Sequence, residues 1–180
     1  DEQLGKVLDE LDSQGLTDST AIVFTTDHGY HLGEHGFWKK GNLHEEVTRV
    51  PLMIRAPGVK PGRTNSLAEL VDFYPTCTDL LGLPAPPKIV GNSLVPILQN
   101  PENKVRNSAL SLHNEKHGKN KGYAIRSNSW TYMNYGDQGE ILYDMVKDPK
   151  QHTNLIDNPD CLETVRKARK RLRLRLQQVQ

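Results

Sequence analysis

Residues 20–46 read TAIVFTTDHGYHLGEHGFWKKGNLHEE, and this stretch decides the fold class. Its first six residues, 20–25, form a short apolar and β-branched run, which is typical of a buried strand and favours a parallel one. A helix is predicted just before this strand, because apolar residues recur at helical spacing between positions 4 and 11 and Gly15 ends the pattern. A helix, a buried strand and a polar loop in this order are the unit of an α/β sheet.

The loop that opens after the strand is the densest candidate site in the sequence. Ligands of α/β sheets gather beyond the carboxyl ends of the strands. Residues 25–46 hold four of the seven histidines, two lysines and several carboxylates. Asp27 and His28 offer a carboxylate oxygen and an imidazole nitrogen to one metal ion, and Gly29 allows a turn that few other residues tolerate. The competing interpretation is an ordinary polar loop in which Asp and His are adjacent by chance.

The rest of the sequence predicts a second, smaller unit. A strand over residues 50–54 and a helix over 66–81, kinked at Pro75, complete the first part. A Pro-rich stretch then separates two predicted domains, residues 1–87 with the metal loop at 26–49, and residues 88–180. Four short strands joined by turns predict an antiparallel meander in the second domain, and a helix from about Asp160 closes the chain.

Composition excludes some classes of function. The hydrophobic fraction is 36%, the charged fraction 25% and the formal net charge +1, which gives no overall case for a nucleic-acid partner. No run of 18 apolar residues is present, so we expect no membrane-spanning helix. Seven Lys and Arg residues nevertheless crowd into residues 166–175. They indicate either a patch for nucleic acid or a sulfated polysaccharide, or the solvated face of an amphipathic helix, and we favour the second.

The ordered series of motifs resembles the type I sulfatases of the alkaline phosphatase superfamily. The branch that it resembles most is that of iduronate-2-sulfatase and choline-sulfatase-like enzymes. The resemblance covers nearly the whole chain in the family's order, through the segments DHGYHLGEHGFWKK (27–40), TRVPLMIRAPG (48–58), LVDFYPTCTDLLGLPAP (70–86), GYAIRSNSWTYMNY (122–135) and ILYDMVKDPKQHTNL (141–155). It implies an α/β fold in which the chain completes a large central mixed sheet with flanking helices, followed by a small antiparallel sheet and a C-terminal helix.

The resemblance also implies roles for individual residues. Asp27 and His28 match half of the family's metal site, which usually holds Ca²⁺. Mn²⁺ or Zn²⁺ stays open, because imidazole is an unusual partner for calcium. Lys40 matches the lysine that contacts the sulfate, and its ammonium group would neutralise charge on the transferred group. Lys39 is the adjacent rival for this role.

Two further histidines are candidates near the substrate. His31 and His35 would each line the substrate pocket or protonate the leaving alcohol, since imidazole titrates near neutral pH. The alternative is that they hold the loop together by hydrogen bonds, which we favour for His31 and His44 and weigh equally for His35. His113 and His117 lie in a polar stretch that would reach the rim of the pocket on a less favoured interpretation.

One element that the family needs is missing. These sulfatases carry a Cys/Ser-x-Pro/Ala-x-Arg motif, whose first residue becomes a formylglycine that attacks sulfur. Neither Cys77 nor Cys161 stands in such a motif. The chain opens without Met or a signal peptide, so we expect it to be the C-terminal portion of a sulfatase, inactive alone and dependent on the N-terminal part of the same protein.

The expected activity of the parent protein is hydrolysis of a sulfate ester on a carbohydrate, such as a 2-sulfated uronate. The alternatives are a phosphonate or phosphodiester hydrolase on the same scaffold, and a non-catalytic binding module. Nucleic acid and membrane are not expected as partners. The family alone implies export or a lysosomal location.

Overall fold

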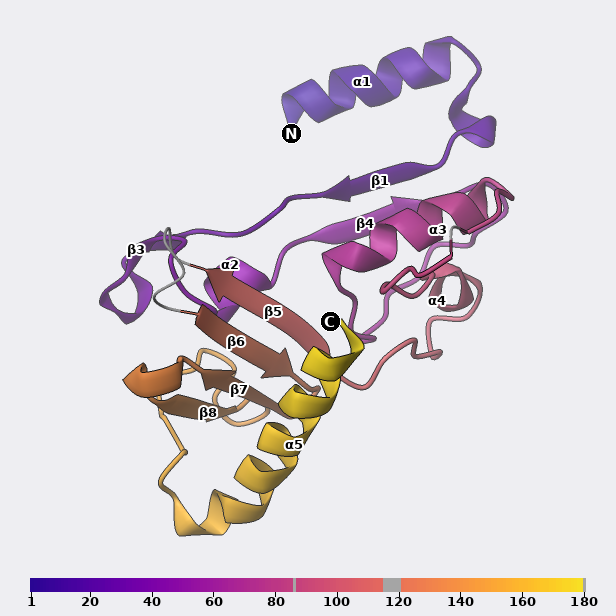
Figure 1. Ribbon diagram of the computed structural model, residues 1–180. Coiled ribbons are helices and arrows are strands. Elements are labelled where there is room, and N and C mark those ends of the chain that lie inside the picture. The colour runs from indigo at the N-terminus through magenta and orange to yellow at the C-terminus, as the bar shows by residue number, and fades with distance from the viewer. Residues whose placement is uncertain (86, 115–120, 180) are drawn as a thin grey trace.

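The computed structural model describes residues 1–85, 87–114 and 121–179 (Figure 1). The first part of the chain combines helices with short strands, and the second contains a short helix, four strands and one long helix. The helices are α1 (Glu2–Ser13), α2 (Glu45–Thr48), α3 (Phe73–Leu80), α4 (Val95–Gln99) and α5 (Leu162–Gln178). The strands are β1 (Ile22–Thr25), β2 (His31–Leu32), β3 (Trp38–Lys39), β4 (Leu52–Arg55), β5 (Ala109–Asn114), β6 (Lys121–Arg126), β7 (Trp130–Asn134) and β8 (Glu140–Asp144).

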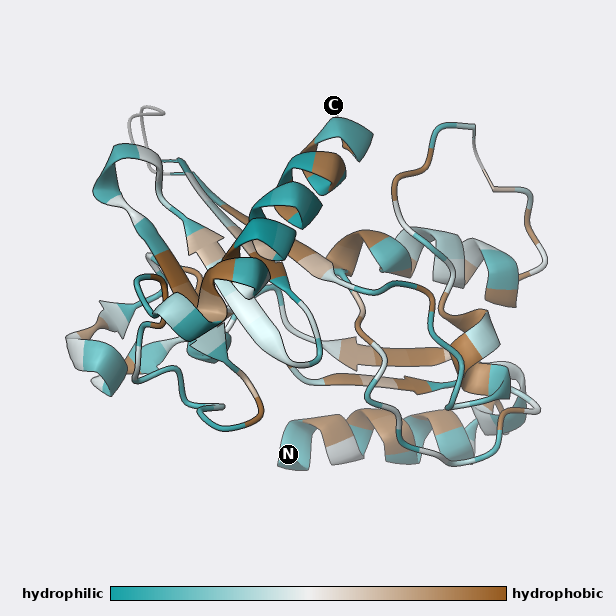
Figure 2. Ribbon diagram, turned by 90° about the horizontal axis from the view of Figure 1, so that it is seen from below, coloured by the Kyte–Doolittle hydropathy of each residue, from teal (hydrophilic) through white to brown (hydrophobic). Residues whose placement is uncertain are grey.

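β1 and β4 form a two-stranded sheet that lies between α1 on one side and α3 on the other (Figures 1 and 2). The pairing is antiparallel, with Val23 opposite Ile54, and Phe24 is 38% exposed. The prediction of a buried, parallel strand at 20–25 is therefore wrong for the described residues. The segment between the two strands turns the chain back on itself, so β4 returns beside β1 in the opposite direction.

β5, β6, β7 and β8 form the predicted antiparallel meander, in sequence order. Side chains on these strands alternate between the two faces, as the pleat requires. Ile125, Tyr132 and Leu142 pack on one face, and their sequence neighbours Ala124 and Met133 belong to the cluster on the other. The sheet is therefore buried on both sides, which explains why its central strands carry almost no exposed apolar residue.

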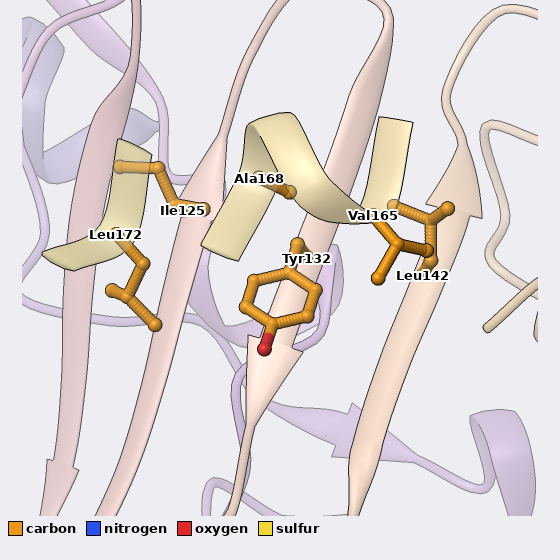
Figure 3. Close-up of a cluster of buried hydrophobic side chains, with 6 residues drawn as sticks. All are labelled: Ile125, Tyr132, Leu142, Val165, Ala168 and Leu172. Atoms are coloured by element: carbon orange, nitrogen blue, oxygen red, sulfur yellow. The ribbon is translucent and has the colours of Figure 1, made fainter. Parts of the chain in front are cut away.

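Helix α5 covers one face of this sheet. Val165, Ala168 and Leu172 recur at helical spacing and are 3%, 0% and 6% exposed. Figure 3 shows the three pointing at side chains of the strands beneath them. The remaining surface of α5 is hydrophilic, with narrow apolar patches between charged residues (Figure 2). The prediction of an amphipathic terminal helix is confirmed.

The other face of the sheet is covered by the loop that follows β3. Leu43, 3% exposed, packs with Met133, Tyr143 and Met145 in a second buried cluster. Leu43 comes from the first predicted domain and its neighbours come from the second. The boundary near residue 87 stays a prediction, but the two parts share this cluster.

The helix predicted over 66–81 begins later than expected. Glu69 and Asp72 form a capping box, in which Glu69 N donates to Asp72 Oδ2 at 2.8 Å, and regular α-helix starts at Phe73. Pro75 therefore falls in the first helical turn, where its missing N–H costs nothing, and it produces no kink. Among the described residues, no helix is long and apolar enough to cross a membrane.

Candidate functional site

The predicted metal pair stands directly after β1. The chain passes so close to α2 at Gly29 that a Cβ there would lie 1.9 Å from the Glu46 carbonyl oxygen. Gly29 N also donates to Val47 O at 2.9 Å. Glycine is therefore required at this position by close backbone approach, and its hydrogen bond to Val47 ties the Asp27–His28 pair to α2.

Asp27, His28 and Lys40 converge at one point. His28 Nδ1 donates to the Gly29 carbonyl oxygen at 2.9 Å, which leaves the lone pair of Nε2 facing outward. Nε2 lies 3.3 Å from Asp27 Oδ2, and Lys40 Nζ contacts the same nitrogen. Lys40 is twelve positions from His28 in the sequence, yet its ammonium meets the His28 imidazole and the Asp27 carboxylate at the same point.

The Asp27 carboxylate is held in its charged form. Desolvation, the largest single cause, raises the pKa of Asp27, but the neighbouring His28, a hydrogen bond from His28 N at 3.0 Å and one from Thr26 Oγ1 together lower it below its ordinary value. Its side chain is 78% exposed in the described chain. An ionised, accessible carboxylate beside an imidazole lone pair is a suitable pair of metal ligands.

Lys40 reaches this point through a tight hairpin. β2 and β3 pair antiparallel with His31 opposite Lys39, and the turn between them uses positive φ at Gly33, His35 and Gly36. Lys39 follows the register of β3, and its neighbour Lys40 is the lysine whose ammonium contacts His28. Lys40, the lysine that the family resemblance selects, is thus the one of the two adjacent lysines whose ammonium contacts His28.

The other predicted histidines lie apart from this group. His31 is 0% exposed, and its Nε2 lies 2.9 Å from Asn42 Oδ1. His35 stacks on His44 with ring centroids 4.6 Å apart, and its Nε2 is 3.4 Å from Glu46 Oε1. His31 is fully buried in the described chain, and its contact with a substrate stays a prediction. His117 lies outside the described residues.

The histidine cluster (His31, His35 and His44) is packed rather than solvated. Burial, followed by the neighbouring His35, lowers the pKa of His44 to about 4. His44 Nε2 lies 3.3 Å from Tyr143 Oη on β8. At neutral pH His44 is therefore an uncharged packing residue that joins the loop to the antiparallel sheet.

Three more contacts fix the loop to the second part of the chain, and no sequence motif predicts them. Leu43 N donates to Tyr135 Oη at 3.1 Å, and Glu45 N donates to Gln151 Oε1 at 2.8 Å. Gln151 is 1% exposed and has a positive φ of 59°. Arg126 Nε donates to Glu45 Oε1 at 3.0 Å. These partners lie 81 to 106 positions from the loop, so no local pattern predicts them.

The described residues fit a metal ion only in part. They contain no group of three or more His, Cys, Asp or Glu side chains placed to hold one. Asp27 and His28 supply two donors, whereas Ca²⁺ takes six to eight oxygen ligands. Because Lys40 is a cation and cannot ligate, a metal ion bound here needs further ligands beyond those that the described residues supply.

The chain is similar to known sulfatases over most of its length. Residues 33–179 match the family described as N-sulphoglucosamine sulphohydrolase, C-terminal. The chain is 39% identical over 166 residues to N-acetylglucosamine-6-O-sulfatase of Bacteroides thetaiotaomicron, which covers 86% of the chain and 30% of that enzyme. It thus spans about a third of the length of the curated relatives that it matches.

Solved structures show the same fold. The structure of BT4656 in complex with its substrate D-glucosamine-2-N,6-O-disulfate superposes with a TM-score of 0.90 at 31% identity, over 98% of this chain and 38% of that one. The phosphonate monoester hydrolase of Agrobacterium radiobacter gives a TM-score of 0.87 at 30% identity, over 98% and 39% of the two chains. These likenesses confirm the predicted alkaline-phosphatase-like α/β fold. Since the family match covers most of the chain, the protein belongs to the sulfatase family, of which these residues form the C-terminal region.

Proposed function

We propose that the protein to which this chain belongs is a sulfuric ester hydrolase that acts on sulfated carbohydrate. The observation that carries the proposal is the convergence of Lys40 Nζ and Asp27 Oδ2 on His28 Nε2. Sulfated sugars are the substrates that the names of two similar proteins give, the 6-O-sulfatase and the glucosamine disulfate complex.

Each residue of this group has a proposed task. Asp27 and His28 provide two ligands of a divalent cation, with Ca²⁺ expected and Mn²⁺ or Zn²⁺ as alternatives, and the remaining ligands come from the N-terminal part of the protein. When bound, the cation supplies positive charge to the sulfate oxygens. Lys40 donates hydrogen bonds to the same oxygens and stabilises the charge that develops there. A formylglycine in the N-terminal part is proposed as the nucleophile.

The neighbouring residues are proposed to position this group. His31 and His35 hold the loop by packing and polar contacts, His35 through Glu46 and His31 through Asn42. Lys39 is exposed, and substrate contact is proposed for it only as a peripheral one. Export or delivery to lysosomes is proposed from the family alone.

Lysine substitutions test the proposal in the full-length protein. Lys40→Ala removes the ammonium from the convergent group, so we expect kcat/KM for a sulfated sugar to fall about 10²- to 10³-fold. Lys39→Ala is the matched control, with the same charge change one position away, and should change kcat/KM less than about threefold. An equal loss in both variants, or none, would remove the assigned role of Lys40.

Metal removal tests the ligand pair. Chelation should abolish turnover, and stepwise addition of Ca²⁺, Mn²⁺ or Zn²⁺ identifies the ion that restores it. Asp27→Asn should raise the metal concentration needed for half-maximal recovery by about 10- to 100-fold. Full activity after exhaustive chelation would contradict a metal site here.

A phosphonate monoester hydrolase is the second candidate, supported by the TM-score of 0.87 to such an enzyme. Assays of matched sulfate and phosphonate monoesters separate the two, and a panel with the sulfate at position 2 of a uronate or position 6 of glucosamine refines the substrate. Turnover of phosphorus esters alone would reject the sulfatase proposal. No turnover of any ester, in protein that carries the nucleophile motif, would favour a non-catalytic module.

A further inference from the structure

A cavity lined by basic residues lies away from the Asp27 loop. It has a volume of about 710 Å³, within the range of small-molecule sites, and it shares no lining residue with residues 26–49. Its walls are the segment before α4, the segment before β5 and one side of α5 near its C-terminal end. Four of its lining residues are basic, namely Lys88, Arg106, Arg171 and Arg175.

Two of the four cations form a fixed base for the cavity. Arg106 Nη1 lies 2.8 Å from Glu69 Oε2, and Arg106 also pairs with Asp72, whose side chain is 0% exposed. Arg175 Nη2 lies 2.7 Å from Glu69 Oε1. Two buried carboxylates therefore hold two guanidinium groups in place and balance their charge.

The wall opposite α5 is fixed as well. A Cβ at Gly91 would lie 2.0 Å from Val71 O, so the segment packs directly on the backbone before α3. Asn92 N donates to Asp72 Oδ1 at 2.8 Å. The cavity is thus built from a rigid base and not from a loose loop.

The other two cations have no balancing charge. Lys88 and Arg171 are both exposed, and neither has a carboxylate oxygen within 4.0 Å in the described part of the chain. The cavity therefore carries a surplus of two positive charges. Lys88 and Arg171 are therefore the cations that a ligand in the cavity can reach, whereas Arg106 and Arg175 are largely buried against their carboxylates.

An oxyanion meets these requirements. Guanidinium groups pair with sulfate or carboxylate oxygens in a planar, bidentate geometry. Val90 and Leu174, each 46% exposed, add apolar surface on opposite walls, against which the face of a sugar ring can pack. Among the described residues, the combination of two exposed cations without carboxylate partners and apolar walls matches a charged sugar better than a simple ion.

We propose that this cavity binds an anionic group of a sulfated saccharide at a second site, separate from the site where the ester is cleaved. The identity of the ligand as a sulfated saccharide rests on the proposed function. The basic lining of the cavity does not depend on it. Part of the basic helix is then a ligand-binding surface, while Val165, Ala168 and Leu172 serve packing.

The test is a binding titration with a disulfated disaccharide on the full-length protein. All variants carry Lys40→Ala so that the ligand is not consumed. Lys88→Gln with Arg171→Gln should weaken binding at least about tenfold at about 150 mM salt. Arg166→Gln with Lys170→Gln, on a side of α5 that does not line the cavity, changes the net charge equally and should weaken binding less than about twofold.

Equal losses in the two double variants would show unspecific attraction to a basic surface and overturn the inference, as would no loss in either. A lower melting temperature of the cavity variant with unchanged affinity would mean that a segment of the protein itself fills the cavity, which also overturns it. The titration needs no turnover, so a lack of sulfatase activity would reject the proposed function and leave this result to stand or fall separately.

Discussion

Single residues decide how closely the two ends of the metal loop approach each other. The backbone contact at Gly29 leaves 1.9 Å between a would-be Cβ and Glu46 O, which no side chain tolerates. The DHG motif thus combines two candidate ligands with the residue that lets them stand against α2. This is a physical reason for glycine at the position, independent of the family.

Gly29→Ala should therefore separate α2 from the end of β1 and displace His28. We expect a loss of about 2–4 kcal/mol in the free energy of unfolding, by analogy with other strained core substitutions, and a loss of activity in the full-length protein. Gly41→Ala is the control in the same loop, since a Cβ there meets nothing within 4 Å. Melting curves and turnover of both variants check this, and a Gly29→Ala protein as stable as the Gly41→Ala protein would contradict it.

His44 predicts a pH dependence of stability. Its pKa is about 4 in the folded state and about 6.5 in the unfolded chain, so the unfolded state binds the proton first as the pH falls. The contribution of His44 is complete above pH 6.5 and is lost progressively down to about pH 4. Between pH 7 and pH 5 we expect a loss on the order of 1–2 kcal/mol.

The variant His44→Gln lacks this titration, so its stability relative to the native protein should improve on going from pH 7 to pH 5. Thermal melts of both proteins at the two pH values measure the difference. If the difference in stability between the two proteins is the same at both pH values, His44 does not titrate as stated.

At the scale of elements, the helical spacing of apolar residues in α5 decides which of its faces packs on the sheet. Its apolar residues at positions 165, 168 and 172 meet the outward side chains of β6, β7 and β8 (Figure 3). This part of the fold was predictable, since a helical period in one segment and alternation in the others require two faces to meet. The start of α3 was not, because the capping box of Glu69 and Asp72 outweighs the apolar stripe that continues upstream.

Leu172→Ala should lower the free energy of unfolding by about 2–5 kcal/mol, because the side chain is 6% exposed and leaves a cavity against the sheet. Leu162→Ala, at the start of the same helix and 52% exposed, should cost less than about 1 kcal/mol. Chemical denaturation of the two variants tests the difference, and similar midpoints would mean that α5 contributes little to the core.

At the scale of the whole molecule, the two parts of the chain differ in how well they are covered. The meander is buried on both faces, whereas β1 and β4 leave apolar side chains accessible. Phe24 and Met53, opposite each other in the sheet, are 38% and 57% exposed, and Val7 on α1 is 65% exposed. The space between α1 and this sheet is a cavity of about 450 Å³. These surfaces are what a larger central sheet would cover.

Residues 1–180 expressed alone should therefore self-associate. We expect the apparent mass in solution to rise with protein concentration. The double variant Phe24→Ser with Met53→Ser should reduce this rise, because it removes accessible apolar surface. Sedimentation over a range of concentrations checks both statements. A monomer with a cooperative melt at all concentrations would contradict the prediction.

The sequence by itself determined the elements that depend on local period: the meander, the amphipathic helix and the strand before Asp27-His28-Gly29. The apolar period of each element spans only a few residues, and burial of its apolar side chains then decides which face packs against the core. The family resemblance selected Lys40 over its neighbour Lys39, and the role of Lys40 at the sulfate stays a prediction. The direction of β1 against β4 did not follow, because pairing depends on where the chain returns and not on the strand's own composition.

Tertiary structure alone decided which groups meet. It placed Lys40 Nζ on His28 Nε2, buried His31 in a histidine cluster, and brought Gln151 and Tyr135 to the loop from about a hundred positions away. It also gathered four basic residues from three separate segments around one cavity. Such contacts arise when distant segments are closed onto a common core, and no local pattern encodes which side chains will then face one another.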